Sequence, residues 1–170
     1  DIKLLKFFYQ KSYIIMKPKI LVSLLSIFLV FVSTTLNAHD YYLGQLTIDH
    51  PYIEKPMPGM DSASGYLVLK NKGNKSDFLV SIETLFSKTN ELHEMSMVND
   101  VMKMKKINGG LEIPPGEEII LKSGGYHIMF KKINKDLTVG EKLKAILKFK
   151  NTGKIIVNFE VQEHKHSHTH

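Results

Sequence analysis

The sequence contains no cysteine, no tryptophan and no arginine among its 170 residues. The absence of cysteine excludes disulfides, zinc–thiolate sites and iron–sulfur clusters. It also excludes the thiolate on which blue-copper electron-transfer sites depend. Any metal chemistry in this chain must therefore use histidine, methionine, aspartate or glutamate.

The chain also has little net charge outside its first 38 residues, which carry five lysines and one acid. Residues 39–170 carry 18 lysines against 16 acids, so the formal charge of +6 overstates how basic this part is. No stripe of basic residues alternates with aromatic ones, which argues against a nucleic-acid binder. No nucleophile elbow or phosphate-binding loop is present either, so we do not expect an enzyme.

The N-terminal segment has the three parts of a secretory signal peptide. Met16 begins a short basic stretch, residues 20–32 form an apolar run, and a small or polar stretch ends at Ala38. The run has about 13 residues, whereas a membrane-spanning helix needs about 20, so a cleaved leader is favoured over an anchor. We expect residues 1–15 to precede the true start and residues 16–38 to be a signal peptide cleaved after Ala38.

Residues 39–163 consist of short apolar stretches separated by turn sequences. The stretches are 65–69, 78–82, 118–121, 126–130, 143–150 and 154–161. In the last two, apolar and polar residues largely alternate, as in a strand that covers a core on one side. No segment has a long helical period, so the pattern predicts an all-β domain, an antiparallel β-sandwich or barrel. Residues 51–61, rich in proline, are predicted to be an irregular loop.

Methionine and histidine alternate with other residues in three short groups. Residues two apart on a strand point to the same side, so each group shares a face. The segment 98–100 could turn the chain back, which would set the first two groups side by side as a hairpin, and a third strand could bring the last group within ligand reach. Thioether and imidazole donors together suit Cu(I), whereas methionine alone is also an ordinary core residue. The groups are His93, Met95 and Met97; Met102 and Met104; His127 and Met129.

Several stretches closely resemble the periplasmic copper chaperone family often called PCuAC. They are residues 91–97, 101–104, 109–116 and 124–129, with further likeness in 46–52 and 65–71. The family fingerprint is a His, ten residues, a Met, about twenty-one or twenty-two residues, and then His-x-Met. Here ten residues separate His93 from Met104, and twenty-two separate Met104 from His127. The resemblance spans nearly all of residues 39–163.

This resemblance implies a cupredoxin-like β-sandwich that binds Cu(I) in the bacterial periplasm and delivers it to the binuclear copper centre of cytochrome c oxidase. The implied partner is oxidase subunit II or another assembly chaperone, and the protein would be a monomer that meets the membrane only through this partner. Met95, Met97 and Met102 would be neighbours or alternates of the ligands. The ligands carried over from the family are His93, Met104, His127 and Met129.

Two further groups lie outside this pattern. Met57 and Met60, in the proline-rich loop, are interpreted as an apolar cap over the sheet, and Met60 is kept as an additional ligand candidate. The C-terminal residues 164–170 alternate histidine with other residues, a metal-binding composition that suits Cu(II) or Zn(II). We expect this tail to capture Cu(II) through His164, His166, His168 and His170.

Two alternatives to a copper carrier are consistent with the same residues. A protein that sequesters copper for tolerance would use the same ligands but would need no partner. A β-sandwich that binds another protein would use the methionines as an adaptable contact patch and would bind no metal.

Overall fold

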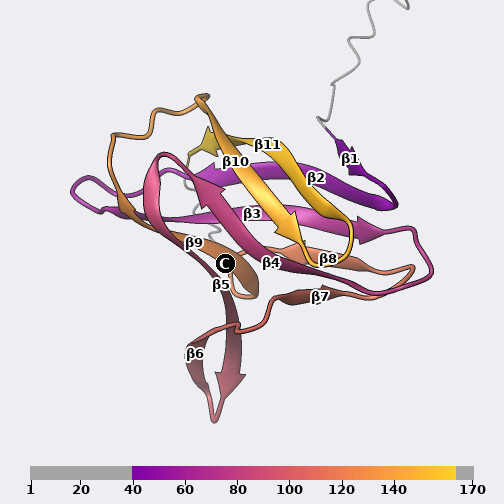
Figure 1. Ribbon diagram of the computed structural model, residues 1–170. Coiled ribbons are helices and arrows are strands. Elements are labelled where there is room, and N and C mark those ends of the chain that lie inside the picture. The colour runs from indigo at the N-terminus through magenta and orange to yellow at the C-terminus, as the bar shows by residue number, and fades with distance from the viewer. Residues whose placement is uncertain (1–39, 164–170) are drawn as a thin grey trace, which may run out of the picture. The chain divides into compact units, whose positions relative to one another are not determined.

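The computed structural model describes residues 40–163, which form eleven β-strands (Figure 1). The predicted all-β fold is confirmed. Between Asp40 and Glu163 the structure contains no helix of the length and apolar character that a membrane crossing requires. The predicted leader 1–38 and the tail 164–170 lie outside the described residues. The strands are β1 (Tyr41–Leu43), β2 (Leu46–Glu54), β3 (Ser62–Asn71), β4 (Asp77–Thr84), β5 (Ser87–Val98), β6 (Val101–Lys106), β7 (Leu111–Ile113), β8 (Glu118–Leu121), β9 (Tyr126–Ile133), β10 (Lys142–Phe149) and β11 (Gly153–Gln162).

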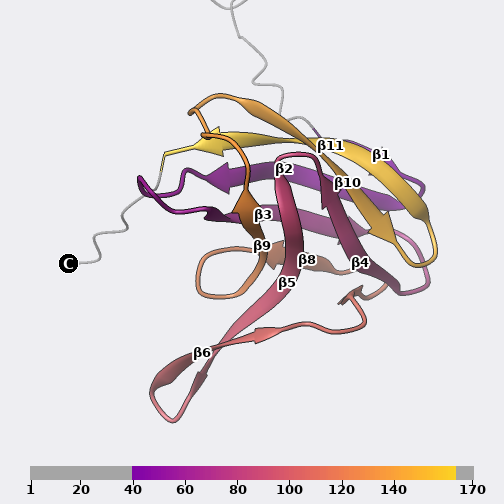
Figure 2. The ribbon, with the colours of Figure 1, turned by 60° about the vertical axis from the view of Figure 1, so that its left-hand side comes forward.

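The strands follow the order β6-β5-β9-β8-β3-β2-β11-β10-β4-β7, with β1 paired to β2 and a further pairing of β9 with β3. Most neighbours are antiparallel, as predicted, but β11 runs parallel to β2 and β8 runs parallel to β9. The sheet curls over a common core. Its curvature brings Phe130 of β9 and Phe159 of β11 into contact, with ring centroids 5.6 Å apart. Figure 2 shows the curled sheet, with β6 and the end of β5 that pairs with it extending away from the other strands.

The core is formed by the apolar residues of alternating strand positions. In β10 the alternation predicted from the sequence is confirmed, since Leu143, Ala145, Leu147 and Phe149 are all buried. β11 contributes its own buried set two residues apart, as a strand packed on one face requires. The same pattern holds in β9, where the core side chains alternate with those of the opposite face. The buried apolar residues of β11 and β9 are Val157, Phe159, Val161, Ile128 and Phe130.

The prediction of an irregular loop over residues 51–61 is wrong for its first part, because β2 continues to Glu54. Pro51 lacks the N–H that a ladder requires, and proline is therefore tolerated in strands mainly at bulges and edges. Here the register shifts between Asp49 and Tyr52, and His50 adopts a φ of 49°, so the chain bulges around the proline. β2 then resumes and pairs with β11, which leaves only residues 55–61 as the loop.

The predicted turn at residues 98–100 is confirmed as a two-residue hairpin turn between β5 and β6. Val98 pairs with Val101, and the two residues between them, Asn99 and Asp100, have φ values of 52° and 61°. Two positive φ values define the type I′ turn, whose twist matches that of the flanking strands, and Asn and Asp tolerate this region better than most residues. The turn therefore sets the register that brings the methionines of the two strands opposite each other.

Asp77, at the start of β4, ties this strand to the turn after β10. Its buried carboxylate accepts hydrogen bonds from the backbone N–H groups of Phe78 (2.7 Å), Asn151 (2.9 Å) and Thr152 (2.9 Å), and from the Thr152 hydroxyl. Burial alone would raise the pKa of this carboxyl, but the hydrogen bonds from Thr152, Asn151 and Phe78 together lower it.

We expect Asp77→Asn to lower the free energy of unfolding at pH 7 by about 2–3 kcal/mol, because the amide turns N–H groups toward donors that then lose their acceptor. A folded-state pKa below the unfolded value means that the charge stabilises the fold above about pH 4 and stops doing so as the pH falls through the folded value. Urea unfolding at pH 7 and pH 3 should show the difference between variant and wild type shrinking at the lower pH. Asp136→Asn, at an exposed position, is the control; an equal loss at both pH values would contradict this account.

Candidate metal centre

Strands β6, β5 and β9 lie side by side and present one common face that carries histidine and methionine. Cross-strand partners share a face and place their side chains in contact range. His93 of β5 pairs with Lys106 of β6 on one side and with His127 of β9 on the other. Along the same face, Met95 pairs with Met104 and Met97 with Met102, while Met129 lies opposite Glu91. The predicted hairpin and third strand are therefore both present.

The two histidines form the centre of this face. Their rings meet edge to face, with centroids 5.5 Å apart and an angle of 81° between the planes. Both side chains are buried, with 5% and 3% of their surface exposed. A buried polar side chain is costly unless its nitrogens are paired, so the hydrogen bonds of these two rings decide what they can do.

Each ring has one nitrogen engaged in a hydrogen bond and one available as an electron-pair donor. His127 Nδ1 lies 3.1 Å from the Gly125 carbonyl oxygen, which can only accept, so this nitrogen carries the proton and Nε2 does not. His93 Nε2 lies 3.0 Å from Glu91 Oε2. Within the described residues, the buried Nδ1 of His93 has no hydrogen-bond partner. An unpaired nitrogen in a buried ring fits a metal ligand, which would satisfy it.

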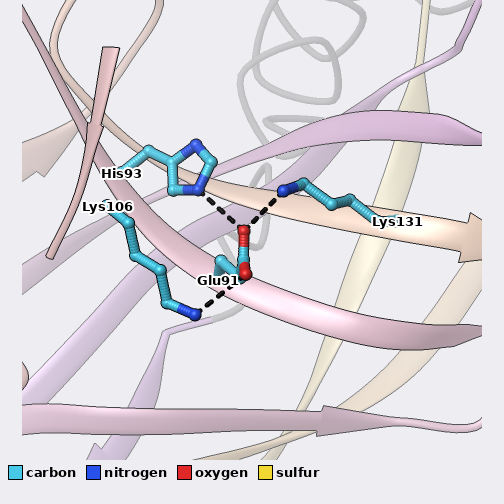
Figure 3. A network of polar contacts seen from close by, with 4 residues as sticks. All are labelled: Glu91, His93, Lys106 and Lys131. Carbon is cyan, nitrogen blue, oxygen red and sulfur yellow. Dashed lines mark hydrogen bonds and ion pairs between the residues drawn. The ribbon is translucent and has the colours of Figure 1, made fainter. Parts of the chain in front are cut away.

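Glu91 holds His93 in this orientation and is itself held by two lysines (Figure 3). Its Oε1 accepts from Lys106 Nζ at 2.9 Å, and its Oε2 accepts from Lys131 Nζ at 2.6 Å as well as from His93. The hydrogen bonds from Lys106, Lys131 and His93 lower the pKa of this carboxyl to about 2. Glu91 is therefore ionised at neutral pH and can only accept, so His93 Nε2 is the donor of this hydrogen bond, and in the tautomer with a single ring proton the lone pair lies on Nδ1.

The pKa of His127 is lowered from its ordinary value. Burial is the main cause because it disfavours the charged ring, and the nearby His93 acts in the same direction, whereas the hydrogen bond to the Gly125 carbonyl opposes them. His127 is accordingly neutral at pH 7. A neutral imidazole is the form that can bind a metal ion.

The methionines continue this face in both directions from the histidine pair, Met104 toward the hairpin turn and Met129 away from it. Met104, Met97 and Met102 lie on the hairpin and are 55%, 62% and 45% exposed. Met129 is half-buried two residues beyond His127, and Met104 lies two residues from the partner of His93. Diagonal neighbours in a sheet are about 7–8 Å apart, within reach of long, flexible side chains. The structure thus gathers His93, Met104, His127 and Met129 on one face of three adjacent strands.

Other candidates from the sequence lie elsewhere. Met60 belongs to the β2–β3 loop and is 55% exposed. The histidines of the tail lie outside the described residues. Within residues 40–163, no three His, Asp or Glu side chains are grouped so that they could hold a metal ion, and the donors that do gather are imidazoles and thioethers.

Sequence reasoning missed the roles of Glu91, Lys106 and Lys131. One local signal was available: in Glu91-x-His93 the carboxylate and the imidazole lie two residues apart and share a strand face. The two lysines could not be found in this way, because they come from β6 and β9 and their positions depend on the register with β5.

We expect Glu91→Gln to weaken Cu(I) binding by about 10–100-fold, the usual cost of losing a hydrogen-bond partner of a histidine ligand. The amide can donate as well as accept, so it no longer fixes the proton on His93 Nε2. Anaerobic competition with a Cu(I) indicator would measure the change. Glu94→Gln provides a matched control, because Glu94 pairs with Lys105 and points to the opposite face; equal losses in both variants would contradict a specific role for Glu91.

The sequence matches a family model and a curated relative. A family model described as "LpqE-like: Putative lipoprotein LpqE-like" matches residues 46–161. A curated relative from Leifsonia xyli subsp. xyli, "Putative lipoprotein Lxx21020", is 28% identical over 102 residues, and the match spans 60% of each chain. The chain therefore covers less than two thirds of this relative's length.

Solved structures share the fold. The apo PCuAC domain from PmoF1 is 25% identical, with a TM-score of 0.64 over 74% of this chain and all of that one. The copper-bound PCuAC domain from PmoF2 is 21% identical, with a TM-score of 0.65 over 74% and 99% of the two chains. The Cu(I) form of DR1885 from Deinococcus radiodurans is 22% identical, with a TM-score of 0.55 over 76% and 85%. The all-β sandwich is thus that of PCuAC domains, and by its match over residues 46–161 the chain belongs to the LpqE-like family.

Proposed function

We propose that this protein binds one Cu(I) ion between His93 and His127, with thioether sulfur from Met104 and Met129, and passes the ion to another protein. The observation that carries the proposal is the buried histidine pair, in which each ring has one nitrogen fixed by a hydrogen bond and one nitrogen with a lone pair. The copper-bound state of two proteins with the same fold supports the choice of metal.

The donor set suits Cu(I) in particular. Thioethers are soft and uncharged, and they select Cu(I) over Mg²⁺, Ca²⁺ and Zn²⁺, while imidazole also suits copper. The hydrogen bonds to Gly125 and Glu91 complete the site, because partners of this kind orient a ligating ring and fix its tautomer. Met95 pairs directly with Met104 and is the natural alternate for it.

A carrier must release its metal to an acceptor, and the hairpin of β5 and β6 is open to solvent, where an acceptor protein can reach it. All six residues of β6 are exposed, including Met102 and Met104. An acceptor can therefore approach the sulfur ligands and exchange them one at a time while the histidines stay in the sheet. This exposure favours a carrier over a protein that sequesters copper, for which a closed site would hold the ion better.

The setting of the transfer follows from the sequence and the family. We propose that the protein is exported to the periplasm after cleavage behind Ala38, a proposal that the lipoprotein description of its relatives supports. The acceptor we propose is the binuclear copper centre of cytochrome c oxidase, reached through subunit II or another assembly chaperone. We propose no enzymatic activity. A strain lacking the protein should then lose oxidase activity at low copper; copper sensitivity with normal oxidase activity would favour sequestration instead.

The direct test is anaerobic loading of the full chain with Cu(I), followed by measurement of stoichiometry and X-ray absorption. A companion protein with the four tail histidines changed to alanine separates copper in the tail from copper in the domain. We expect mixed sulfur and nitrogen ligation that is lost in the double variant His127→Ala, Met129→Ala. Sulfur-ligated copper that persists undiminished in this double variant would refute the ligand set.

Binding should weaken in acid, because protonated imidazole cannot bind a metal. The pKa of free histidine is about 6.5. Burial depresses the pKa of His127, so this ring stays competent to a lower pH than a free histidine would. An affinity unchanged between pH 7 and about pH 4.5 would count against histidine ligation.

A further inference from the structure

The loop between β2 and β3 carries two exposed methionines that the proposed copper site does not use. Met57 and Met60 are 63% and 55% exposed, and they line a pocket with Ser64 and Met129 of the sheet, so the predicted apolar cap covers the sheet only in part. Both methionines lie in a loop of only seven residues, 55–61, which joins β2 to β3. The backbone of this short loop determines how close together the two side chains begin.

A tight turn holds these two methionines together. In Met57-Pro58-Gly59-Met60, the Met60 N–H donates to the Met57 carbonyl oxygen at 3.1 Å, and Gly59 has a φ of 84°. Proline at the second position and a positive-φ glycine at the third are typical of a type II turn, whose first and last Cα atoms lie within about 7 Å. The fixed φ of proline stiffens this turn. The Cα atoms that carry the two thioether side chains are therefore held close together by the turn.

The floor below this turn contains a third thioether. Met129 of β9 lies opposite Ser64 of β3, on the face of the sheet that the loop covers. A shallow pocket of about 190 Å³ is lined by all three methionines together with Lys55, Pro56 and the small residues of β3, Ser62, Ala63 and Ser64. The carboxylate at this rim, Glu54, accepts a hydrogen bond from the Tyr66 hydroxyl at 3.4 Å. A carboxylate oxygen is a hard donor, so the soft donors of this pocket are the sulfur atoms of the three methionines.

We propose that Met57, Met60 and Met129 form a second site for a soft monovalent ion, Cu(I), distinct from the histidine pair. Three thioethers without an imidazole select Cu(I) over harder divalent ions. The chain of methionine has three rotatable bonds, so sulfur atoms that start close together can converge on one ion.

Met129 belongs to both sites, because it lies two residues from His127 on the same face. When one ion is bound, the Met129 side chain can serve either the histidine pair or the loop, so the ion can pass between the two positions without leaving the protein. When both sites are loaded, Met129 serves the loop and Met104 remains the thioether of the histidine pair. The second site goes beyond the proposed function and does not depend on transfer to a partner. It adds a position on the side of the histidine pair that faces away from the β5–β6 hairpin, since β9 lies between β5 and β3 in the sheet.

The test uses the full chain with ¹³C-labelled methionine methyl groups, titrated with Cu(I) under anaerobic conditions. Cu(I) is diamagnetic, so each methyl signal can be followed. We expect the signals of Met57, Met60 and Met129 to shift together, and the double variant Met57→Leu, Met60→Leu to bind about one copper fewer per chain. Leucine preserves the volume and the apolar character of the side chain. Met97→Leu, at a position with the same exposure as Met57, should leave the shifts of the loop methionines in place.

A second arm separates this site from the proposed function. In the variant His93→Ala, His127→Ala the loop methionine signals should still shift on Cu(I) addition. Signals of Met57 and Met60 that stay fixed throughout the wild-type titration, or an unchanged copper count in the leucine double variant, would overturn the second site while leaving the histidine site untouched. If the copper count is unchanged in the histidine double variant but falls in the leucine double variant, the proposed function is refuted and the second site is retained.

Discussion

Replacing His93 and His127 together by alanine is expected to lower the affinity for Cu(I) by more than about 100-fold. Loss of a hydrogen-bond partner behind a ligand already costs about 10–100-fold, and this change removes two of the proposed ligands themselves. The remaining thioethers lie on the exposed hairpin and at Met129. In this variant no imidazole lies between these two groups of sulfur donors. Anaerobic competition with a Cu(I) indicator would measure the effect.

The control for this experiment is an exposed histidine on the same domain. His50 has a positive φ, so His50→Asn keeps a residue that tolerates this conformation, and it should leave the affinity unchanged. Because alanine leaves a cavity at each buried ring, His93→Gln with His127→Gln should be measured as well, and circular dichroism should confirm that both double variants keep the sheet. A folded double variant that binds Cu(I) as tightly as the wild type would exclude the histidine pair as the site.

Phe130→Ala is expected to lower the free energy of unfolding by about 3–5 kcal/mol, the usual cost of truncating a buried phenylalanine. The side chain is fully buried and contacts two other rings, Phe86 at 5.0 Å and Phe159 at 5.6 Å between centroids. It belongs to β9, directly after Met129, and it packs the back of the strand that carries His127. Urea unfolding should show this loss, and Val139→Ala, at an exposed position, should cost far less.

Gly65 of β3 provides a specific check on this packing. A Cβ at this position would clash with Phe130 Cε2, so Gly65→Ala should cost about 1–3 kcal/mol in the wild-type background. In the Phe130→Ala background the clash is absent, and the same change should be nearly neutral. A double-mutant cycle measures this coupling. Equal costs in both backgrounds would show that Phe130 does not set the limit on this position.

Much of the candidate site could be predicted from local sequence. The spacing of two in His93-x-Met95-x-Met97 and in His127-x-Met129 means a shared face in any strand, and Asn99-Asp100 between two such segments is a strong signal for a two-residue turn. What spacing cannot supply is which strands become neighbours. The approach of His127 to His93 depends on the pairing of β9 with β5, which are separated by β6, β7 and β8 in the chain.

The fold was predictable to a similar extent. The alternation in β10 and β11 reports one-sided burial directly, so both strands follow from the sequence. The parallel pairing of β11 with β2 leaves no local signal, because it joins the first long strand to the last. The continuation of β2 through Pro51 was missed for a physical reason. Proline normally ends a ladder, and only the bulge at His50 allows the strand to resume.

The exposure of the hairpin methionines has a consequence for oxidative stress. Peroxide converts a thioether to a sulfoxide, which is polar and no longer a soft donor. Met97, Met102 and Met104 all stand in solvent, and none of them is part of the buried core. Oxidants would therefore inactivate the proposed copper site while the sandwich stays folded, and reduction of the sulfoxides by a methionine sulfoxide reductase would restore binding without any refolding.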